Sequence, residues 1–391
     1  MASVEAILNS MEQGIQALGG KSMKVALLSP FIHPIVEPFV GGIEASIHRL
    51  ASGLSRQGVS VVCYACEGSV IPGVEVRTCG VSASALAYPR EPDEMNEEEI
   101  LTIRAYEDAI MYQAIENALE DPSIDVLHNN SFSGVPFFLS GLVALPMLHT
   151  LHLPPILPSM TETLRLCMAE DVALQVVALS HAQAQLWLPY YPVSRVIYNG
   201  LDFDTIPHSL SHDGTLAFVG KIDPNTGIED AIEVASYLGK KLSIYGAPEP
   251  YNTLYFEGCI QPLLQTHPNV IYHGLVDQQT LFRGLGQAQA LLFPVKWDEP
   301  FGNVITEAMA VGTPVIMYDR GSACELITEG VSGYVVSQDN LIEMASAVKR
   351  TEAIDRSACA DYARECFSLK KSVGEYLELL QSICYSSTRK S

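Results

Sequence analysis

The sequence is poor in basic residues. Its 391 residues include 23 lysines and arginines against 45 aspartates and glutamates, which gives a formal net charge of -22. A surface this negative repels phosphate backbones and anionic lipid headgroups. We therefore expect neither nucleic acid nor an acidic membrane to be a partner.

The sequence also lacks a hydrophobic run long enough to span a membrane. Residues 126–161 contain no Asp, Glu, Lys or Arg, but five prolines interrupt them. The longest uninterrupted stretch, 137–145, is far shorter than the ~20 residues that a bilayer requires. Residues 1–22 carry Glu5 and Glu12 and have no basic start, so they are not typical of a signal peptide. We expect a cytoplasmic protein without stable membrane insertion, whose first domain begins at Met23.

Cysteine pairs and metal ligands with a recognisable spacing are missing as well. Nine cysteines are scattered along the chain without a disulfide framework, which indicates a reducing compartment. Cys63 and Cys66 form a CxxC, but the apolar run around them predicts a strand with the two thiols on opposite faces. The pair His149 and His152 has the spacing of a strand end, and the DxD at 202–204 falls in a linker. We therefore expect no metal and no cofactor.

The pattern that is present alternates short apolar runs with amphipathic helical stretches. A chain of this length exceeds what one hydrophobic core supports, so it predicts two domains. Repeated strand and helix segments predict doubly wound parallel sheets. Strands are expected within residues 23–30, 59–65, 124–128, 146–152, 174–179, 194–199, 215–220, 241–246, 269–274, 290–295, 313–319 and 332–336.

The alternation pauses at residues 199–214, a polar stretch that reads as an interdomain linker. The predicted fold is α/β, with two Rossmann-like domains facing each other across a cleft at the carboxyl ends of their strands. The expected boundaries are 23–200 for the first domain and 201–370 for the second. Residues 371–391 are expected to form a helix that packs back on the first domain. The acidic stretch 91–99 predicts the start of a helix that runs to about Glu120.

The strongest local signal is EPFGNVITE, in which seven residues separate Glu299 from Glu307. On a helix Glu307 shares the apolar face, so its carboxylate needs hydrogen-bonding partners, and a ribose diol is one. The alternative is that Glu307 only pairs inside the core. Glu299 falls in the loop before the helix, where backbone N–H groups of residues 301–303 point outward at the positive helix end. Such a loop suits sugar hydroxyls.

This motif resembles the E-x7-E element of retaining family-4 glycosyltransferases, which have the GT-B fold. Further segments resemble the family in the same order: GGIE at 41–44, HTLH at 149–152, NGLD at 199–202, FVGKIDPNTG at 218–227, HGLV at 273–276 and RGSACELI at 320–327. The resemblance implies retaining transfer of a hexose, with glucose as the first candidate, from a nucleoside diphosphate sugar to a soluble small-molecule or saccharide acceptor. The stretch 283–304 resembles cyanobacterial UDP-glucose pteridine glucosyltransferases more than lipid-modifying members.

The resemblance also implies that the first domain, 23–200, binds the acceptor and that the second, 201–370, binds the nucleotide-sugar donor. It further implies roles for particular residues. His152, Glu299 and Lys221 would be catalytic, with His152 beside the donor sugar and Lys221 at the diphosphate. The implied donor-binding residues are Gly41, Gly42, Lys221, Thr226, Gly274, Leu275, Val276, Phe301, Gly302, Asn303 and Glu307.

The sequence departs from the family at the diphosphate loop. Lys221 and Thr226 stand where the family usually carries an arginine and a lysine. The first change loses a bidentate fork, and the second removes a cation. Leaving-group stabilisation is therefore expected to be weaker. The alternative function is a catalytically weak nucleotide-sugar-binding protein of the same fold, and a pyridoxal-dependent phosphorylase of this fold is a second one.

Overall fold

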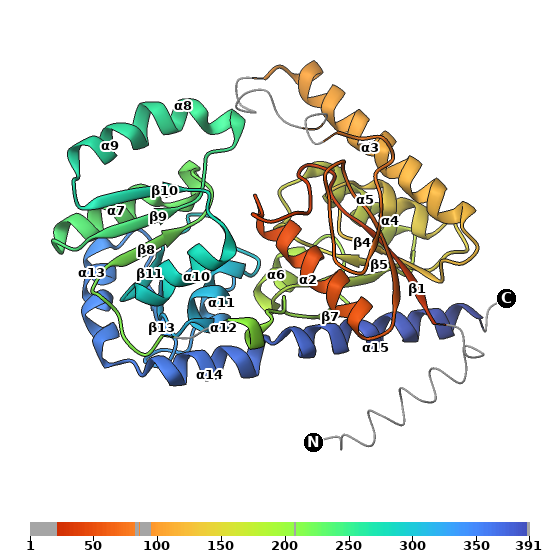
Figure 1. Cartoon of the computed structure of the whole chain (residues 1–391). Coiled ribbons are helices and arrows are strands. Elements are labelled where there is room, and N and C mark those ends of the chain that lie inside the picture. The colour runs from red at the N-terminus through yellow and green to blue at the C-terminus, as the bar shows by residue number, and fades with distance from the viewer. Residues whose placement is uncertain (1–21, 83–85, 87–94, 207–208, 389–391) are drawn as a thin grey trace.

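Two parallel β-sheets organise the computed structural model, one in each half of the chain (Figure 1). The structure describes residues 22–82, 86, 95–206 and 209–388. Four segments with sequence-based expectations therefore lie outside the described residues: the N-terminal 1–21, residues 91–94 of the acidic stretch, 207–208 of the linker and 389–391 at the C-terminus.

Within the described residues, the first sheet has seven strands in the order β3-β2-β1-β4-β5-β6-β7, all paired in parallel. The strands are β1 Lys24–Leu28, β2 Ser60–Tyr64, β3 Glu75–Arg77, β4 Val126–Asn129, β5 Met147–Thr150, β6 Gln175–Ala178 and β7 Arg195–Val196. Its helices are α2 Gly42–Arg56, α3 Glu97–Glu120, α4 Val135–Ser140, α5 Pro158–Ala169 and α6 His181–Trp187. The helix expected after the acidic stretch is α3, and Asn96 and Glu99 form its capping box.

The second sheet has six strands among the described residues, in the order β10-β9-β8-β11-β12-β13. They are β8 Leu216–Val219, β9 Leu242–Tyr245, β10 Val270–Gly274, β11 Ala290–Phe293, β12 Val315–Tyr318 and β13 Gly333–Val336. Its helices are α7 Ile228–Tyr237, α8 Thr253–Tyr255, α9 Gln261–Thr266, α10 Gln278–Gln287, α11 Asn303–Ala310, α12 Ala323–Leu326, α13 Leu341–Arg350 and α14 Arg356–Phe367.

These sheets confirm the predicted pair of Rossmann-like domains. Every strand expected from the sequence is present, and β3 is the strand that the sequence analysis missed. It has three residues at the edge of the sheet, and none of them is fully buried, so it leaves no apolar run in the sequence. Cys63 and Cys66 are both buried and belong to different core clusters, in agreement with the predicted opposite faces.

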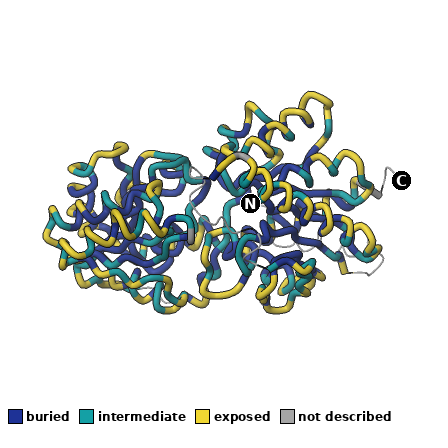
Figure 2. Tube along the Cα trace, turned by 90° about the horizontal axis from the view of Figure 1, so that it is seen from above, coloured by how far each residue is buried: buried dark blue, intermediate teal, exposed yellow. Residues whose placement is uncertain are grey.

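The strands are short and apolar because helices cover both faces of each sheet. In β1, Leu27 packs into one core cluster and its neighbour Leu28 into another on the opposite face. The second domain is built around a single large cluster. Figure 2 shows these buried residues gathered inside the two lobes, with exposed residues on the outer helices.

The long helix α15, Leu369–Thr388, starts beside the second domain and lies along the first (Figure 1). Its buried face, including Val373, Tyr376 and Leu380, belongs to the same core cluster as α2. A Cβ atom on Gly53 of α2 would lie 2.5 Å from Val373, so the two helices touch closely there. The chain thus returns to the first domain, and α15 is part of its core.

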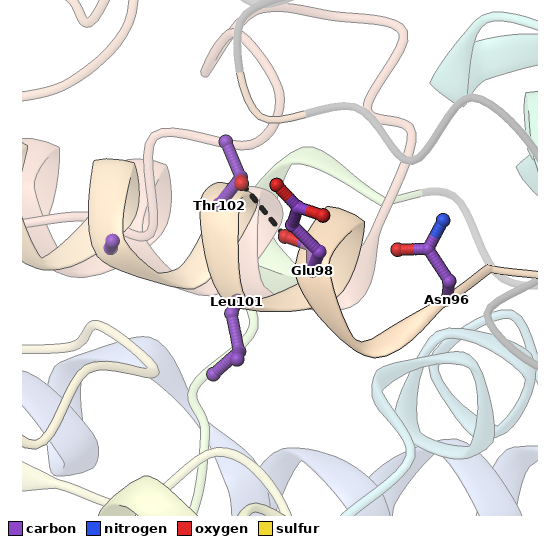
Figure 3. Close-up of a pocket in the computed structure, with 5 residues that line it drawn as sticks. Asn96, Glu98, Leu101 and Thr102 are labelled. Atoms are coloured by element: carbon purple, nitrogen blue, oxygen red, sulfur yellow. Dashed lines mark hydrogen bonds between the residues drawn. The ribbon is translucent and has the colours of Figure 1, made fainter.

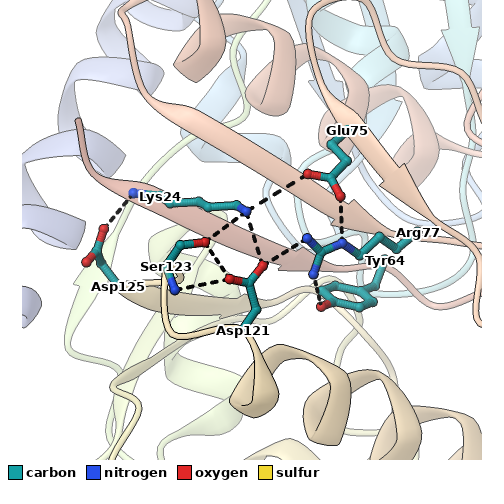
Figure 4. A network of polar contacts seen from close by, with 7 residues as sticks. All are labelled: Lys24, Tyr64, Glu75, Arg77, Asp121, Ser123 and Asp125. Atoms are coloured by element: carbon teal, nitrogen blue, oxygen red, sulfur yellow. Dashed lines mark hydrogen bonds and ion pairs between the residues drawn. The ribbon is translucent and has the colours of Figure 1, made fainter. Parts of the chain in front are cut away.

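A polar network ties β1 and β3 to the turn after α3 (Figure 4). The Asp121 carboxylate accepts hydrogen bonds from Ser123, from Arg77 at 2.9 Å and from Lys24 at 3.1 Å. These bonds, the Ser123 hydroxyl first among them, lower the pKa of Asp121. The network explains how a short, partly exposed edge strand stays attached to the sheet.

None of the helices within the described part of the chain combines the length and the apolar character needed to cross a bilayer.

The packing of α15 gives a first prediction. Leu380 is fully buried, so Leu380→Ala leaves a cavity and should lower the free energy of unfolding by about 2–5 kcal/mol. Glu378 on the same helix is exposed and pairs with Arg195 at 3.0 Å, so Glu378→Ala should cost less than about 1 kcal/mol. Urea unfolding of both variants measures the difference. Equal stability of the two variants would show that α15 is not part of the core.

Candidate active site

A cavity of about 980 Å³ lies between the two domains. Loops that follow the carboxyl ends of strands from both sheets line it, which is where open α/β sheets bind ligands. All the predicted site residues except Gly274 line this cavity. The structure therefore brings together residues that are spread over more than 260 positions, from Gly41 to Glu307.

The first turn of α2 forms one wall. Gly41 is its N-cap residue, and no side chain caps the helix, so its first N–H groups remain available to an anion. A Cβ atom on Gly41 would lie 2.5 Å from Glu44 Oε2, and one on Gly42 would lie 3.2 Å from Asn303 Nδ2. A side chain at either position would therefore require Glu44 or Asn303 to move.

The first turn of α11 lies next to that of α2 and also lines the cavity. Its N-cap residue Gly302 has a left-handed backbone, with φ 75° and ψ 77°. Asn303 Nδ2 donates to the Gly42 carbonyl at 2.7 Å and to Ser46 Oγ at 2.8 Å, and Asn303 Oδ1 accepts from Asn199 Nδ2 at 3.0 Å. The N-termini of α2 and α11 thus meet across the domain boundary.

Glu299 precedes α11 and has protein atoms around its carboxylate. Burial raises its pKa to about 7, although hydrogen bonds from the backbone N–H groups of Phe301 and Gly302 act in the opposite direction. Two of the N–H groups that we expected to face a sugar therefore already have Glu299 as a partner. The carboxyl can change its protonation state near neutral pH.

Glu307 lies on α11 with its side chain mostly buried, and its protein partner is Arg49 of α2 at 2.5 Å. The alternative from the sequence is that Glu307 pairs inside the core. Glu307 does form an ion pair, but its partner belongs to the other domain. Glu307 still lines the cavity. The sequence analysis missed Arg49. Its position, three and seven residues from Ser46 and Gly42 counted along one helix face, places it on the side of α2 that meets the second domain.

Lys221 follows β8, and its ammonium pairs with Glu249 Oε1, which also lies 3.2 Å from His33 Nε2. Thr226 ends the adjacent turn, and its hydroxyl donates to the Asp223 carbonyl at 2.6 Å. The predicted diphosphate loop therefore holds a cation that already has an acidic partner. Neither Glu249 nor His33 was identified from the sequence, because each lies in a loop without a motif.

His152 is a neutral imidazole, since burial lowers its pKa to about 3. Its Nε2 lies 3.0 Å from Asn130 Oδ1, while Asn130 Nδ2 donates to the His128 carbonyl at 3.2 Å. Because the Asn130 amide nitrogen faces a carbonyl, its oxygen must accept the His152 Nε2–H. His152 Nδ1 is then left as an acceptor. Asn130 is a positioning residue that the sequence did not reveal.

The predicted base-reading turn lies at the end of β10. Gly274 has φ 69°, which favours glycine, and it stands outside the cavity, whereas Leu275 and Val276 line it. Its role is to turn the chain so that the next two residues reach the cavity.

Two weaker candidates can be set aside. A hollow at the start of α3 is lined by Asn96, Glu98, Leu101, Thr102 and Ala105, all exposed and all from the same segment, so it encloses nothing (Figure 3). The DxD aspartates form ion pairs, Asp202 with Arg56 at 2.8 Å and Asp204 with Arg364 at 2.7 Å. Among the residues that the structure describes, no group of three His, Cys, Asp or Glu side chains is placed to hold a metal ion.

Two family models match the chain, one in each domain. The model of glycosyltransferase family 4 matches residues 40–205, and that of glycosyl transferases group 1 matches residues 213–352.

Several curated proteins are similar in sequence. D-inositol 3-phosphate glycosyltransferase of Mycolicibacterium smegmatis is 25% identical over 86% of this chain and 85% of its own length. An uncharacterised protein of the Klebsiella pneumoniae cps region is 31% identical, and glycogen synthase of Mycobacterium tuberculosis is 29% identical. These two matches cover 29% and 39% of this chain, and the chain spans only 33% and 38% of the two relatives.

Solved structures share the fold. A glycosyltransferase involved in avilamycin A biosynthesis has a TM-score of 0.66 and 19% identity, over 93% of this chain and 98% of its own. Anabaena HepE, solved with UDP-glucose, has a TM-score of 0.68 and 16% identity, over 92% of this chain and 100% of its own. These neighbours establish the GT-B arrangement of the two domains.

The raised pKa of Glu299 predicts a pH-dependent stability. Its pKa is 4.5 in the unfolded chain and about 7 in the folded one, so the folded state binds more protons between these values and loses stability as pH rises through them. Glu299→Gln removes this effect. The variant should gain stability over the parent between pH 5 and pH 8, by up to about 3 kcal/mol. Thermal unfolding measures it, with exposed Glu257→Gln as control. A difference that is independent of pH would contradict the raised pKa.

Proposed function

Because this chain belongs to the family-4 glycosyltransferases with the GT-B fold, we propose that it transfers a hexose from a nucleoside diphosphate sugar, with retention at the anomeric carbon. The observation that carries the proposal is the convergence of two helix N-termini, those of α2 and α11, with Glu299 and Glu307 on one interdomain cavity. Helix N-termini suit a diphosphate, and paired carboxylates suit sugar and ribose hydroxyls.

Each part of the donor is assigned to a group that lines the cavity. The diphosphate lies at the N–H groups of Gly41 and Gly42 and near Lys221, and the ribose lies at Glu307. The base lies against Leu275 and Val276. The sugar is held by Glu299 and the first turn of α11, next to His152. All of these groups line the same cavity.

The proposed reaction needs no protein nucleophile. The bond between the anomeric carbon and the diphosphate oxygen breaks, the acceptor oxygen bonds to the same face of the sugar, and its proton passes to the departing diphosphate. Neutral His152 presents Nδ1 as an acceptor for a sugar hydroxyl and adds no charge. The protein contributes positioning and electrostatic stabilisation.

For the donor sugar we propose glucose, delivered from UDP. The structural neighbour HepE was solved with UDP-glucose, and the stretch 283–304 resembles UDP-glucose pteridine glucosyltransferases. For the acceptor we propose a soluble small molecule or saccharide in the cytoplasm. The net charge of -22 supports this choice, because it disfavours anionic membrane surfaces.

The second candidate function is a nucleotide-sugar-binding protein with little turnover. Two observations favour it. Thr226 stands where the family usually has a lysine, and the remaining cation, Lys221, is already paired with Glu249. Both observations weaken stabilisation of the leaving group. Incubation with UDP-glucose and a panel of acceptors separates the two functions, since release of UDP is required only by the first.

Substitutions of Glu307 and Glu299 should have different effects on UDP affinity and on turnover. Glu307→Gln should weaken UDP binding by about ten- to a hundredfold, because the ribose loses a charged acceptor. Glu299→Gln should leave UDP affinity within about threefold and lower turnover of UDP-glucose. Titration calorimetry with UDP and a UDP-release assay measure both, with Glu257→Gln as control. Unchanged UDP affinity in Glu307→Gln would remove the ribose assignment.

Activity should survive excess EDTA, because the proposed site stabilises the diphosphate with helix N-termini and Lys221 and without a metal ion. The measurement is the rate of UDP release before and after chelation. Loss of activity that manganese restores would show that a metal ion takes part.

A further inference from the structure

The Glu249 carboxylate forms an ion pair with Lys221, which is the one cation of the predicted diphosphate loop, residues 218–227. Its side chain is only 5% exposed, and its Oε1 contacts both the Lys221 ammonium and, at 3.2 Å, His33 Nε2. The bonds with these two groups hold the pKa of Glu249 at about 2, against the effect of its burial. Glu249 is therefore ionised, and it links a loop of the second domain to the first domain.

This ion pair stands at the N-terminus of α2. A Cβ atom on Gly41 would lie 3.8 Å from Lys221 Cε and 2.5 Å from Glu44 Oε2. That same Glu44 oxygen is buried without a hydrogen-bond partner, and burial raises the pKa of the carboxyl. Two carboxyl groups thus surround a single ammonium at the place where the donor diphosphate is proposed to bind.

The rest of the cavity does not compensate for these acids. Its lysine and arginine lining residues are Lys221 and Arg320. The carboxylic side chains that line it are Glu37, Glu44, Asp223, Glu249, Asp298, Glu299 and Glu307. A diphosphate placed next to Lys221 would meet an ionised Glu249 at close range, and like charges at that distance repel strongly.

We propose that Glu249 is an internal anion that takes the place of the donor diphosphate at Lys221 and is displaced when the nucleotide binds. This inference rests on the proposed function. It makes Glu249 a determinant of nucleotide affinity, because each binding event must break the Lys221–Glu249 pair. Through His33, the same carboxylate also contacts the first domain.

Substitution of Glu249 by glutamine tests the inference. Glu249→Gln keeps the size of the side chain and a hydrogen-bonding oxygen but removes the charge. It should tighten binding of the nucleoside diphosphate by about tenfold or more and leave binding of the nucleoside unchanged, since a nucleoside has no phosphate. Calorimetry with UDP, ADP and GDP, each paired with its nucleoside, measures both, and exposed Glu257→Gln is the control. In a Lys221→Met background, Glu249→Gln should tighten binding much less.

The outcomes distinguish this inference from the proposed function. Weaker diphosphate binding by Glu249→Gln would mean that Glu249 positions Lys221 for the ligand, and equal binding would mean that it has no influence. Either result overturns the inference while the proposed function stands. If no nucleoside diphosphate binds the parent protein, the proposed function fails, and the inference fails with it.

Discussion

The arrangement of the two domains depends on a contact between the first turns of α2 and α11. Asn303 at the start of α11 hydrogen-bonds to the backbone of Gly42, and a side chain at position 41 or 42 would collide with Glu44 or crowd Asn303. Because the first turns of the two helices lie side by side, their positive N-termini face the same cavity. A side chain at position 41 or 42 would need Glu44 or Asn303 to shift, so glycine suits this interdomain contact.

Polar contacts between the domains complete this interface. Arg49 pairs with Glu307, His33 contacts Glu249, and the Glu325 carboxylate accepts the N–H groups of His181 and Ala182 at 2.8 Å and 3.1 Å, which caps α6 of the first domain. Removing one partner of the buried Arg49–Glu307 pair leaves an uncompensated charge, so this pair fixes the domain orientation strongly. Two of these carboxylates, Glu249 and Glu307, also line the cavity. The same two side chains therefore belong both to the contact between the domains and to the lining of the cavity.

The electrostatic character of the cavity follows from burial. His152 is neutral, Glu299 titrates near pH 7, and Lys221 is paired, so little fixed positive charge faces the cleft. In the reaction that we propose, stabilisation of the departing diphosphate relies on backbone N–H groups, whose partial charges cannot be lost by substitution of a side chain. Such a site is consistent with the replacement of the family's arginine and lysine by Lys221 and Thr226.

The sequence by itself determined the fold class, nearly all the strands and the position of Glu299 in the loop before α11. Apolar runs and helical spacing are local, and they report which face of an element is buried. Only the tertiary structure decided which charges meet, since Arg49 and Glu307 are 258 positions apart and His33 and Glu249 are 216 apart. The sequence marks Glu307 as a carboxylate that needs a partner but carries no local signal for Arg49, and it marks Lys221 as a cation without showing that Glu249 neutralises it. Those contacts form only when two separately folded sheets place their loops opposite each other.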